Sequence, residues 1–358
     1  MARQVIDTTT DHGTYKGDPA KIAFDKANAN FAELYGSGKN LVINGGLQWW
    51  QWGTTRAAST AAGFLADRFG FAAAGTTIAA SRIGREGLPS PDSLPSGVAA
   101  ALRIQVASVA GANNYAVVRT RLEDVRQLSG KKVTLSFYAN CESGTFKVGF
   151  EASQLFGAGG SAEVMEAAKQ SFTLTTTAQR FTYTFTLPSV VGKTVGDRSS
   201  TSLNWWLDAG SNFASRASAA GQKSGAVRIW GVQLEEGDYA SDFEWRAPAI
   251  ELLLCQRYCY EMRFPAGTAF APVFRLSATS IIGWLDTSVD MAMVPAVRLA
   301  SGQIGFSDGV AVTSVSLTPA SNRRVAIVGN VASGTAGSSS YITGLVSDPA
   351  RLLFDAEI

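Results

Sequence analysis

Strict alternation of apolar and hydroxyl-bearing side chains is the feature that most constrains how this chain can fold. Residues 181–187 read FTYTFTL, so every odd position is apolar and every even position is threonine. Side chains on a β-strand point alternately to opposite faces, so such a strand buries one face and presents the other to solvent. Residues 133–137, VTLSF, repeat the pattern. A mainly β fold is therefore predicted.

Further short runs of strand-forming residues are separated by loops rich in Gly, Ser and Pro. Within residues 40–246 they lie at 102–106, 115–121, 145–150, 202–207 and 227–234. So many short strands indicate a two-sheet, jelly-roll-like β-sandwich, in which Asn40–Thr55 would contribute the first strand. Another group of strand patterns between residues 263 and 358 predicts a smaller C-terminal β-sandwich.

Two helices are predicted outside the β-domains. Residues 1–39 form an N-terminal segment with a helix at 19–35, which Pro19 opens and Gly36 ends. Its apolar stripe is heptad-like and suits either packing on its own domain or self-association and docking into an assembly. We favour assembly, because so short a helix is unstable alone. The assembly residues are Phe24, Ala27, Phe31, Leu34 and Tyr35. A second helix, within 247–262, links the two β-domains.

Charge and hydropathy argue against two classes of partner. The formal net charge is only +2 and no dense Lys/Arg cluster occurs, so nucleic-acid binding is not expected. No segment reaches 18 apolar residues, and the N-terminus lacks the apolar core of a signal peptide. We expect synthesis in the cytoplasm and no membrane insertion.

Metal and cofactor chemistry are not expected either. The three cysteines, Cys141, Cys255 and Cys259, have no accompanying histidine pair, since His12 is the only histidine. We interpret them as buried, inert thiols. We therefore predict no metal and no cofactor.

Three short motifs occur along the chain. The first has Asn44–Gly45, Trp50–Gln51 and Gly53, followed by ADRF at 66–69. The second is IWGVQLEEG at 229–237 with FEWR at 243–246, and the third runs from Pro248 to Tyr258. Together with the sequence of the N-terminal helix, these motifs resemble those of tail fibre and virion appendage proteins of tailed bacteriophages.

The resemblance implies a specific organisation. Residues 40–246 would form a sandwich like that of carbohydrate-binding modules. The N-terminus would attach the chain to other virion or tail proteins, and the C-terminal domain would be distal. A homotrimer on the virion, contributing to recognition of a host surface glycan, is what the resemblance implies.

Glycan contacts would use aromatic rings, which stack on the C–H face of sugars, beside polar side chains. In LNWWLD, residues 203–208, Trp205 and Trp206 must point to opposite faces of a strand. Trp206 with Asn204 and Asp208 is therefore a candidate glycan site, and Trp284 and Tyr341 are further candidates. For Trp49, Trp50 and Trp52 we favour core packing.

Catalysis has weaker support. A nucleophilic triad would need His12 in the polar N-terminal segment. The acidic run Glu235, Glu236, Asp238, Asp242 and Glu244 could supply a glycosidase pair, but loop solvation or a structural cation explains it better. We predict no catalytic residues. The alternatives to a recognition subunit are a purely structural adaptor or decoration protein and a polysaccharide-degrading enzyme.

Overall fold

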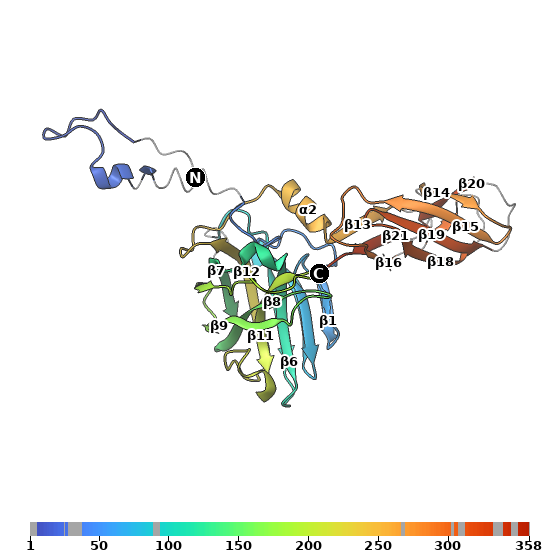
Figure 1. Cartoon of the computed structure of the whole chain (residues 1–358), viewed down its shortest axis with the longest axis horizontal. Helices are drawn as coiled ribbons and strands as arrows, with labels where there is room; N and C mark the ends of the chain where they lie inside the picture. Colours follow the sequence, from blue (N-terminus) through green and yellow to red (C-terminus); the bar gives the residue numbers. More distant parts are fainter. Residues whose placement is uncertain are drawn as a thin grey trace.

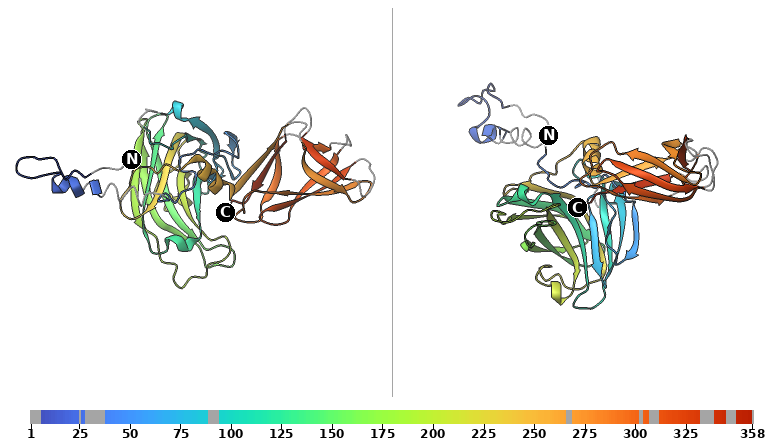
Figure 2. Two further views of the ribbon diagram at one scale, coloured as in Figure 1. Left: turned by 90° about the horizontal axis from the view of Figure 1, so that it is seen from above. Right: turned by 45° about the vertical axis from the view of Figure 1, so that its right-hand side comes forward.

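A computed structural model describes residues 6–24, 26–27, 38–88, 94–265, 269–301, 304–306, 312–331, 339–344 and 350–357. The described part is mainly β, as predicted. A large sandwich lies in the middle, with the C-terminal strands on one side and the N-terminal helical residues on the other (Figure 1). Two further views show the same arrangement (Figure 2).

Two six-stranded antiparallel sheets form the large sandwich. Their strand orders are β1-β4-β5-β12-β7-β10 and β2-β3-β6-β11-β8-β9. The strands are β1 (Thr55–Ser59), β2 (Gly63–Phe64), β3 (Gly70–Ala74), β4 (Thr77–Gly84), β5 (Ala100–Ala107), β6 (Tyr115–Glu123), β7 (Lys132–Cys141), β8 (Phe146–Leu155), β9 (Val164–Leu174), β10 (Gln179–Thr186), β11 (Ser200–Ala209) and β12 (Gly225–Glu236). Short 3₁₀ helices lie at η1 (Arg85–Gly87), η3 (Val125–Leu128) and η4 (Ser211–Phe213).

The core between these sheets is aromatic. The Trp205 ring meets Phe137 at 5.8 Å and Phe150 at 5.6 Å between ring centroids, in edge-to-face arrangements. On the edge strand β10, Phe185 is buried while Thr182 and Thr184 are exposed. The alternation in the sequence therefore reflects one face of the strand turned to the core and the other turned to solvent, as predicted.

The C-terminal strands form a three-stranded sheet, β13-β21-β16, and a six-stranded sheet, β17-β20-β14-β15-β19-β18. Buried residues of both sheets share one hydrophobic cluster that includes Val273, Ile327, Leu352 and Phe354. The strands are β13 (Cys259–Phe264), β14 (Ala269–Arg275), β15 (Ser280–Asp286), β16 (Ala296–Ser301), β17 (Ile304–Phe306), β18 (Val312–Pro319), β19 (Arg324–Val331), β20 (Ser339–Gly344) and β21 (Ala350–Asp355).

The linking helix is shorter than predicted. Helix α2 spans Pro248–Gln256, and residues 259–264 form strand β13 instead of continuing to 262 as helix. Pairing with β21, in which Cys259 lies opposite Asp355, imposes the extended conformation. Cys255 therefore lies in the helix and Cys259 begins the strand.

The stretch Asn40–Thr55 is also different from the prediction. It is not a strand until Thr55, because residues 40–54 follow turns and irregular backbone. Asn44 and Leu47 have positive φ angles of 60° and 53°, which lie outside the β region. Some of its backbone groups pair with strand β12, as the Leu41 N–H does with the Leu234 carbonyl at 2.8 Å, and the others need further partners.

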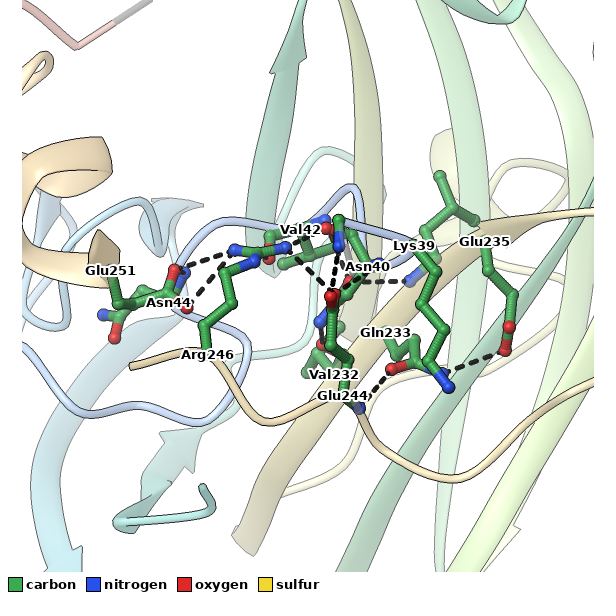
Figure 3. Close-up of polar contacts among 12 residues, drawn as sticks. Lys39, Asn40, Val42, Asn44, Val232, Gln233, Glu235, Glu244, Arg246 and Glu251 are labelled. Atoms are coloured by element: carbon green, nitrogen blue, oxygen red, sulfur yellow. Dashed lines mark hydrogen bonds and ion pairs between the residues drawn. The ribbon is translucent and has the colours of Figure 1, made fainter. Parts of the chain in front are cut away.

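Side chains from the end of the sandwich provide those groups (Figure 3). Glu244 accepts a hydrogen bond from the Asn40 backbone N–H at 2.7 Å, and Arg246 donates to the Asn40 carbonyl. Arg246 also forms an ion pair with Glu251 at 3.1 Å. Asn40 itself donates from Nδ2 to the Val232 carbonyl at 3.1 Å. We call these contacts the clasp.

Asn44 and Gly45, the first motif residues, have equally local explanations. Asn44 Oδ1 accepts from the backbone N–H of Gln48 at 2.9 Å and of Trp49 at 3.0 Å, which fixes the turn. A Cβ at Gly45 would lie 2.0 Å from the Val232 carbonyl oxygen. No larger residue fits where the segment crosses β12.

Removing Arg246 should destabilise the sandwich strongly. Its side chain is only 12% exposed, and Arg246→Ala would leave Glu251, 8% exposed, without its cation. Breaking a buried ion pair in this way costs about 3–5 kcal/mol. Urea unfolding followed by tryptophan fluorescence measures the effect. Arg126→Ala removes an ion pair whose arginine is 66% exposed, and should change stability by no more than about 0.5 kcal/mol. Equal losses in the two variants would contradict this account of the clasp.

Candidate functional site

Trp206 does not have a surface available for a sugar. It lies on the outer face of β11 and is 3% exposed. Phe213 stacks on its ring with centroids 5.5 Å apart, and the Arg216 guanidinium lies 4.9 Å from the ring. The indole N–H donates to Glu151 at 3.0 Å. The predicted stacking of Trp206 on a glycan is therefore wrong, because a loop after β11 covers the ring.

Asp208 and Asn204 do not join Trp206 in one site. Asp208 is fully buried and accepts hydrogen bonds from Ser108 Oγ at 2.7 Å and the Lys223 backbone N–H at 2.8 Å. It therefore holds the loops at one end of the sandwich, and its predicted glycan role is also wrong. Asn204 lies on the outer face of the sheet, opposite Arg119 in the neighbouring strand β6, but it is only 7% exposed, so its predicted glycan contact is wrong as well.

The C-terminal sheet exposes aromatic side chains, whereas the large sandwich buries Trp206. Tyr341 in β20 lies opposite Pro272 in β14, and the β14–β15 register places Trp284 on the other side of Pro272. Tyr341 is 53% exposed and Trp284 45% exposed. Phe274 and Val328, in the next row of the same face, are also exposed. We call these five residues the aromatic face. It lies opposite the face that carries Val273 and Ile327 into the core.

The acidic run has structural partners. Glu235 accepts from the Ser241 backbone N–H at 2.9 Å and hydroxyl at 2.7 Å. Glu236 pairs with Lys131 at 2.6 Å, and Glu244 belongs to the clasp. These contacts account for most of the run as part of the sandwich boundary.

Among the described residues, no three His, Cys, Asp or Glu side chains are placed to hold a metal ion. No helix of the described part has the length and apolarity to cross a membrane. The three cysteines are buried, and burial raises the pKa of Cys255 and of Cys259 well above the usual thiol value.

Part of the predicted N-terminal helix is described. Residues 20–24 and 26–27 are helical, Phe24 is 69% exposed and Ala27 is partly exposed. Phe31, Leu34 and Tyr35 lie outside the described residues. The exposure of Phe24 leaves an assembly role as a prediction.

The motif residues Gln51 and Arg68 connect the two β-domains. Gln51 Nε2 donates to the Cys259 carbonyl at 2.7 Å, and its Oε1 accepts from the Glu261 backbone N–H at 3.0 Å. Arg68 is 2% exposed, forms an ion pair with Glu357 and lies 3.5 Å from the centre of the Tyr258 ring. We call this set of contacts the joint.

Asp67 completes the joint and is its most perturbed acid. Its carboxylate accepts from the Gln51 backbone N–H and side-chain amide, both at 2.7 Å. Burial nevertheless raises the pKa of Asp67 to about 7, from an ordinary value of 3.8. Burial also raises the pKa of Glu357. Removal of these acids from water therefore outweighs the hydrogen bonds that favour their charged forms.

The raised pKa predicts that stability falls as pH rises. Between about pH 4 and 7 the folded protein holds a proton on Asp67 that the unfolded chain releases, so the stabilisation present below about pH 4 is lost as pH rises through 7. The slope contributed by one such group is at most about 1.4 kcal/mol per pH unit. Asp67→Asn should flatten the pH dependence of the free energy of unfolding, measured by urea titration from pH 5 to 8. An unchanged slope in that variant would contradict the assignment.

Comparison with known proteins gives no family. No family model matches the chain, and no curated protein matches it significantly. Among solved structures, a family 11 carbohydrate-binding module from Clostridium thermocellum, in complex with a β-1,3-1,4-mixed-linked tetrasaccharide, is 12% identical with a TM-score of 0.30; the match covers 51% of this chain and 94% of that one.

Two further structures show similarity of the same order. The CBM22-2 xylan-binding domain of Paenibacillus barcinonensis Xyn10C is 13% identical with a TM-score of 0.28, and the match covers 47% of this chain and 91% of that one. The enzymatically active domain of tailspike protein 4 from bacteriophage CBA120 is 12% identical with a TM-score of 0.31, over 56% of this chain and 22% of that one. Similarity at these TM-scores carries no weight for what this chain binds.

Proposed function

We propose that this chain is a non-catalytic subunit of a phage tail fibre or related virion appendage, and that it contributes to recognition of a host surface glycan. The sequence motifs described above support the appendage assignment. The aromatic face of the C-terminal sheet supports the recognition role, and it is the single observation that carries it.

The aromatic face has the chemistry of a sugar platform. Trp284 and Tyr341 lie on strands separated only by β14, so their backbones are about 10 Å apart. Two rings at that separation suit an extended oligosaccharide, which stacks alternate sugar units on a flat surface. Arg324, paired with Asp286 at 2.7 Å, lies 6.0 Å from the Trp284 ring and offers polar groups to sugar hydroxyls.

Assembly would supply the affinity that one such face lacks. A few stacking contacts bind weakly, but several linked copies gain about 10²- to 10⁴-fold in avidity where the geometry permits simultaneous contact. In this proposal the N-terminal helix attaches the chain to other virion proteins and associates as a homotrimer. The exposed side chain of Phe24 is compatible with that role.

A structural adaptor or decoration role has one specific observation in its favour. Phe274, 55% exposed, and Val328, 40% exposed, extend the aromatic face with purely apolar surface. Apolar surface without polar groups suits a protein partner better than a sugar. If the face binds another virion protein, Val328 should matter as much as Trp284.

Substitution of the rings tests the proposal. Trp284→Ala and Tyr341→Ala should each weaken binding to a glycan selected on an array by about tenfold or more, measured by calorimetry with the full-length protein. Loss of exposed rings should change the free energy of unfolding little. Tyr239→Ala, at a side chain 75% exposed elsewhere, is the matched control and should bind as the wild type does.

The two roles give different results with Val328→Thr. Glycan binding should persist in this variant, because the rings remain. Retention of glycan binding in Trp284→Ala and Tyr341→Ala, or absence of any glycan ligand together with failed particle incorporation in Val328→Thr, would instead establish the adaptor role.

A further inference from the structure

Two arginines on the outer face of the large sandwich have no acidic partner. Arg119 and Arg121 alternate along β6, so both point to the face away from the core. Both are partly exposed. Within the described ranges, no residue provides an oxygen at hydrogen-bond or ion-pair distance to either guanidinium, and Nε of Arg121 is buried without an acceptor.

The lack of a partner for Arg119 and Arg121 is unusual within the same molecule. Several other partly buried arginines pair with carboxylates, as in Arg103–Glu142 at 2.7 Å, Arg216–Glu151 at 2.8 Å and Arg257–Glu123 at 2.7 Å. Arg85 and Arg180 donate to backbone carbonyls instead. Removing a charged group from water without a partner is costly, and folds retain such groups mainly where function requires them.

A small pocket brings the two arginines together with the joint. Its lining is Phe64, Arg68, Arg119, Thr120, Arg121 and Glu357. The one acid in this lining, Glu357, already forms an ion pair with Arg68. Burial lowers the pKa of Arg119, and burial together with the charges of Arg119 and Arg68 lowers the pKa of Arg121 to about 10. Glu163, an exposed residue, is the other acid whose charge reaches Arg121. The pocket therefore has excess positive charge.

Buried hydroxyl and amide side chains lie beside the arginines. On the neighbouring strand β11, Asn204 lies opposite Arg119 and Ser202 lies opposite Arg121. Ser202 Oγ donates to Asn204 Oδ1 at 2.9 Å, and Asn204 Nδ2 lies 3.4 Å from Ser153 Oγ on β8. These three side chains are buried and pair with one another, whereas the two arginines need an anion.

Building on the proposed glycan recognition, we propose that Arg119 and Arg121 form an anion-accepting subsite for a carboxylated saccharide. A planar guanidinium forms paired hydrogen bonds with a carboxylate, which gives geometric selectivity as well as charge. Two cations and a net charge of +2 are too few for nucleic acid, which needs an extended basic track. This subsite is separate from the aromatic face and does not depend on it.

Binding of oligogalacturonate to the full-length protein tests the proposal. The wild type should bind it more tightly than its methyl ester, which keeps the ring and loses the charge. Arg119→Gln and Arg121→Gln should each weaken binding by about tenfold. Arg82→Gln, at an exposed arginine on β4 of the other sheet, is the matched control and should leave binding unchanged.

The unfolding temperature of the variants and competition by inorganic sulfate complete the test. Because neither arginine has a partner to lose, the glutamine variants should unfold at the same temperature as the wild type or higher. Equal affinity for acid and ester, wild-type binding by both variants, or inorganic sulfate competing as strongly per anion as oligogalacturonate would each overturn the proposal. Trp284→Ala should keep the arginine-dependent binding, so failure of the aromatic face and failure of this subsite give distinguishable results.

Discussion

The ion pair between Arg246 and Glu251 is the interaction on which the architecture depends. Residues 40–54 cross the end of the sandwich outside any strand, and unpaired backbone groups in a buried segment are costly. Arg246, Glu244 and Asn40 satisfy those groups, while Glu251 neutralises Arg246 from helix α2. One set of charges therefore closes the sandwich and fixes the start of the linking helix. This explains why the motifs lie almost two hundred residues apart in sequence but act as one structural unit.

The same irregular segment continues into the joint, so closure of the sandwich and placement of the C-terminal domain are coupled. Gln51 follows the clasp residues by a few positions and contacts the first strand of the C-terminal domain through both ends of its amide. Arg68 then contacts Glu357, near the end of the last strand. Because these contacts are buried and directional, they specify one relative orientation more tightly than apolar packing alone would. A rigid orientation is what repeated weak binding requires, since avidity is lost when the sites cannot engage together.

Much of the fold was predictable because it depends on local alternation. Strand β10 and the core position of Trp205 follow from the period of two in the sequence. The conformation of Asn40–Thr55 was not predictable in this way, because its apolar run fits a strand, whereas the Asn44 turn and the distant residues Glu244 and Arg246 hold it otherwise. Trp206 was misassigned for a related reason. Its exposure depends on whether a later loop covers it, and Phe213 and Arg216 do so.

Arg119 and Arg121 show what a search of the sequence misses and how assignment of the strand recovers part of it. A search for runs of basic residues passes over Arg119 and Arg121, because two cations separated by one threonine do not form a run. On a strand, however, that spacing places both guanidinium groups on one face, and the signal is present in the sequence once the strand is assigned. The sequence does not show that a neutralising acid is absent. Glu357 could have paired with either arginine, but it forms an ion pair with Arg68 instead. The ADRF motif thus has two effects: it secures the joint, and by occupying Glu357 it leaves the positive charge on β6 available to an anion.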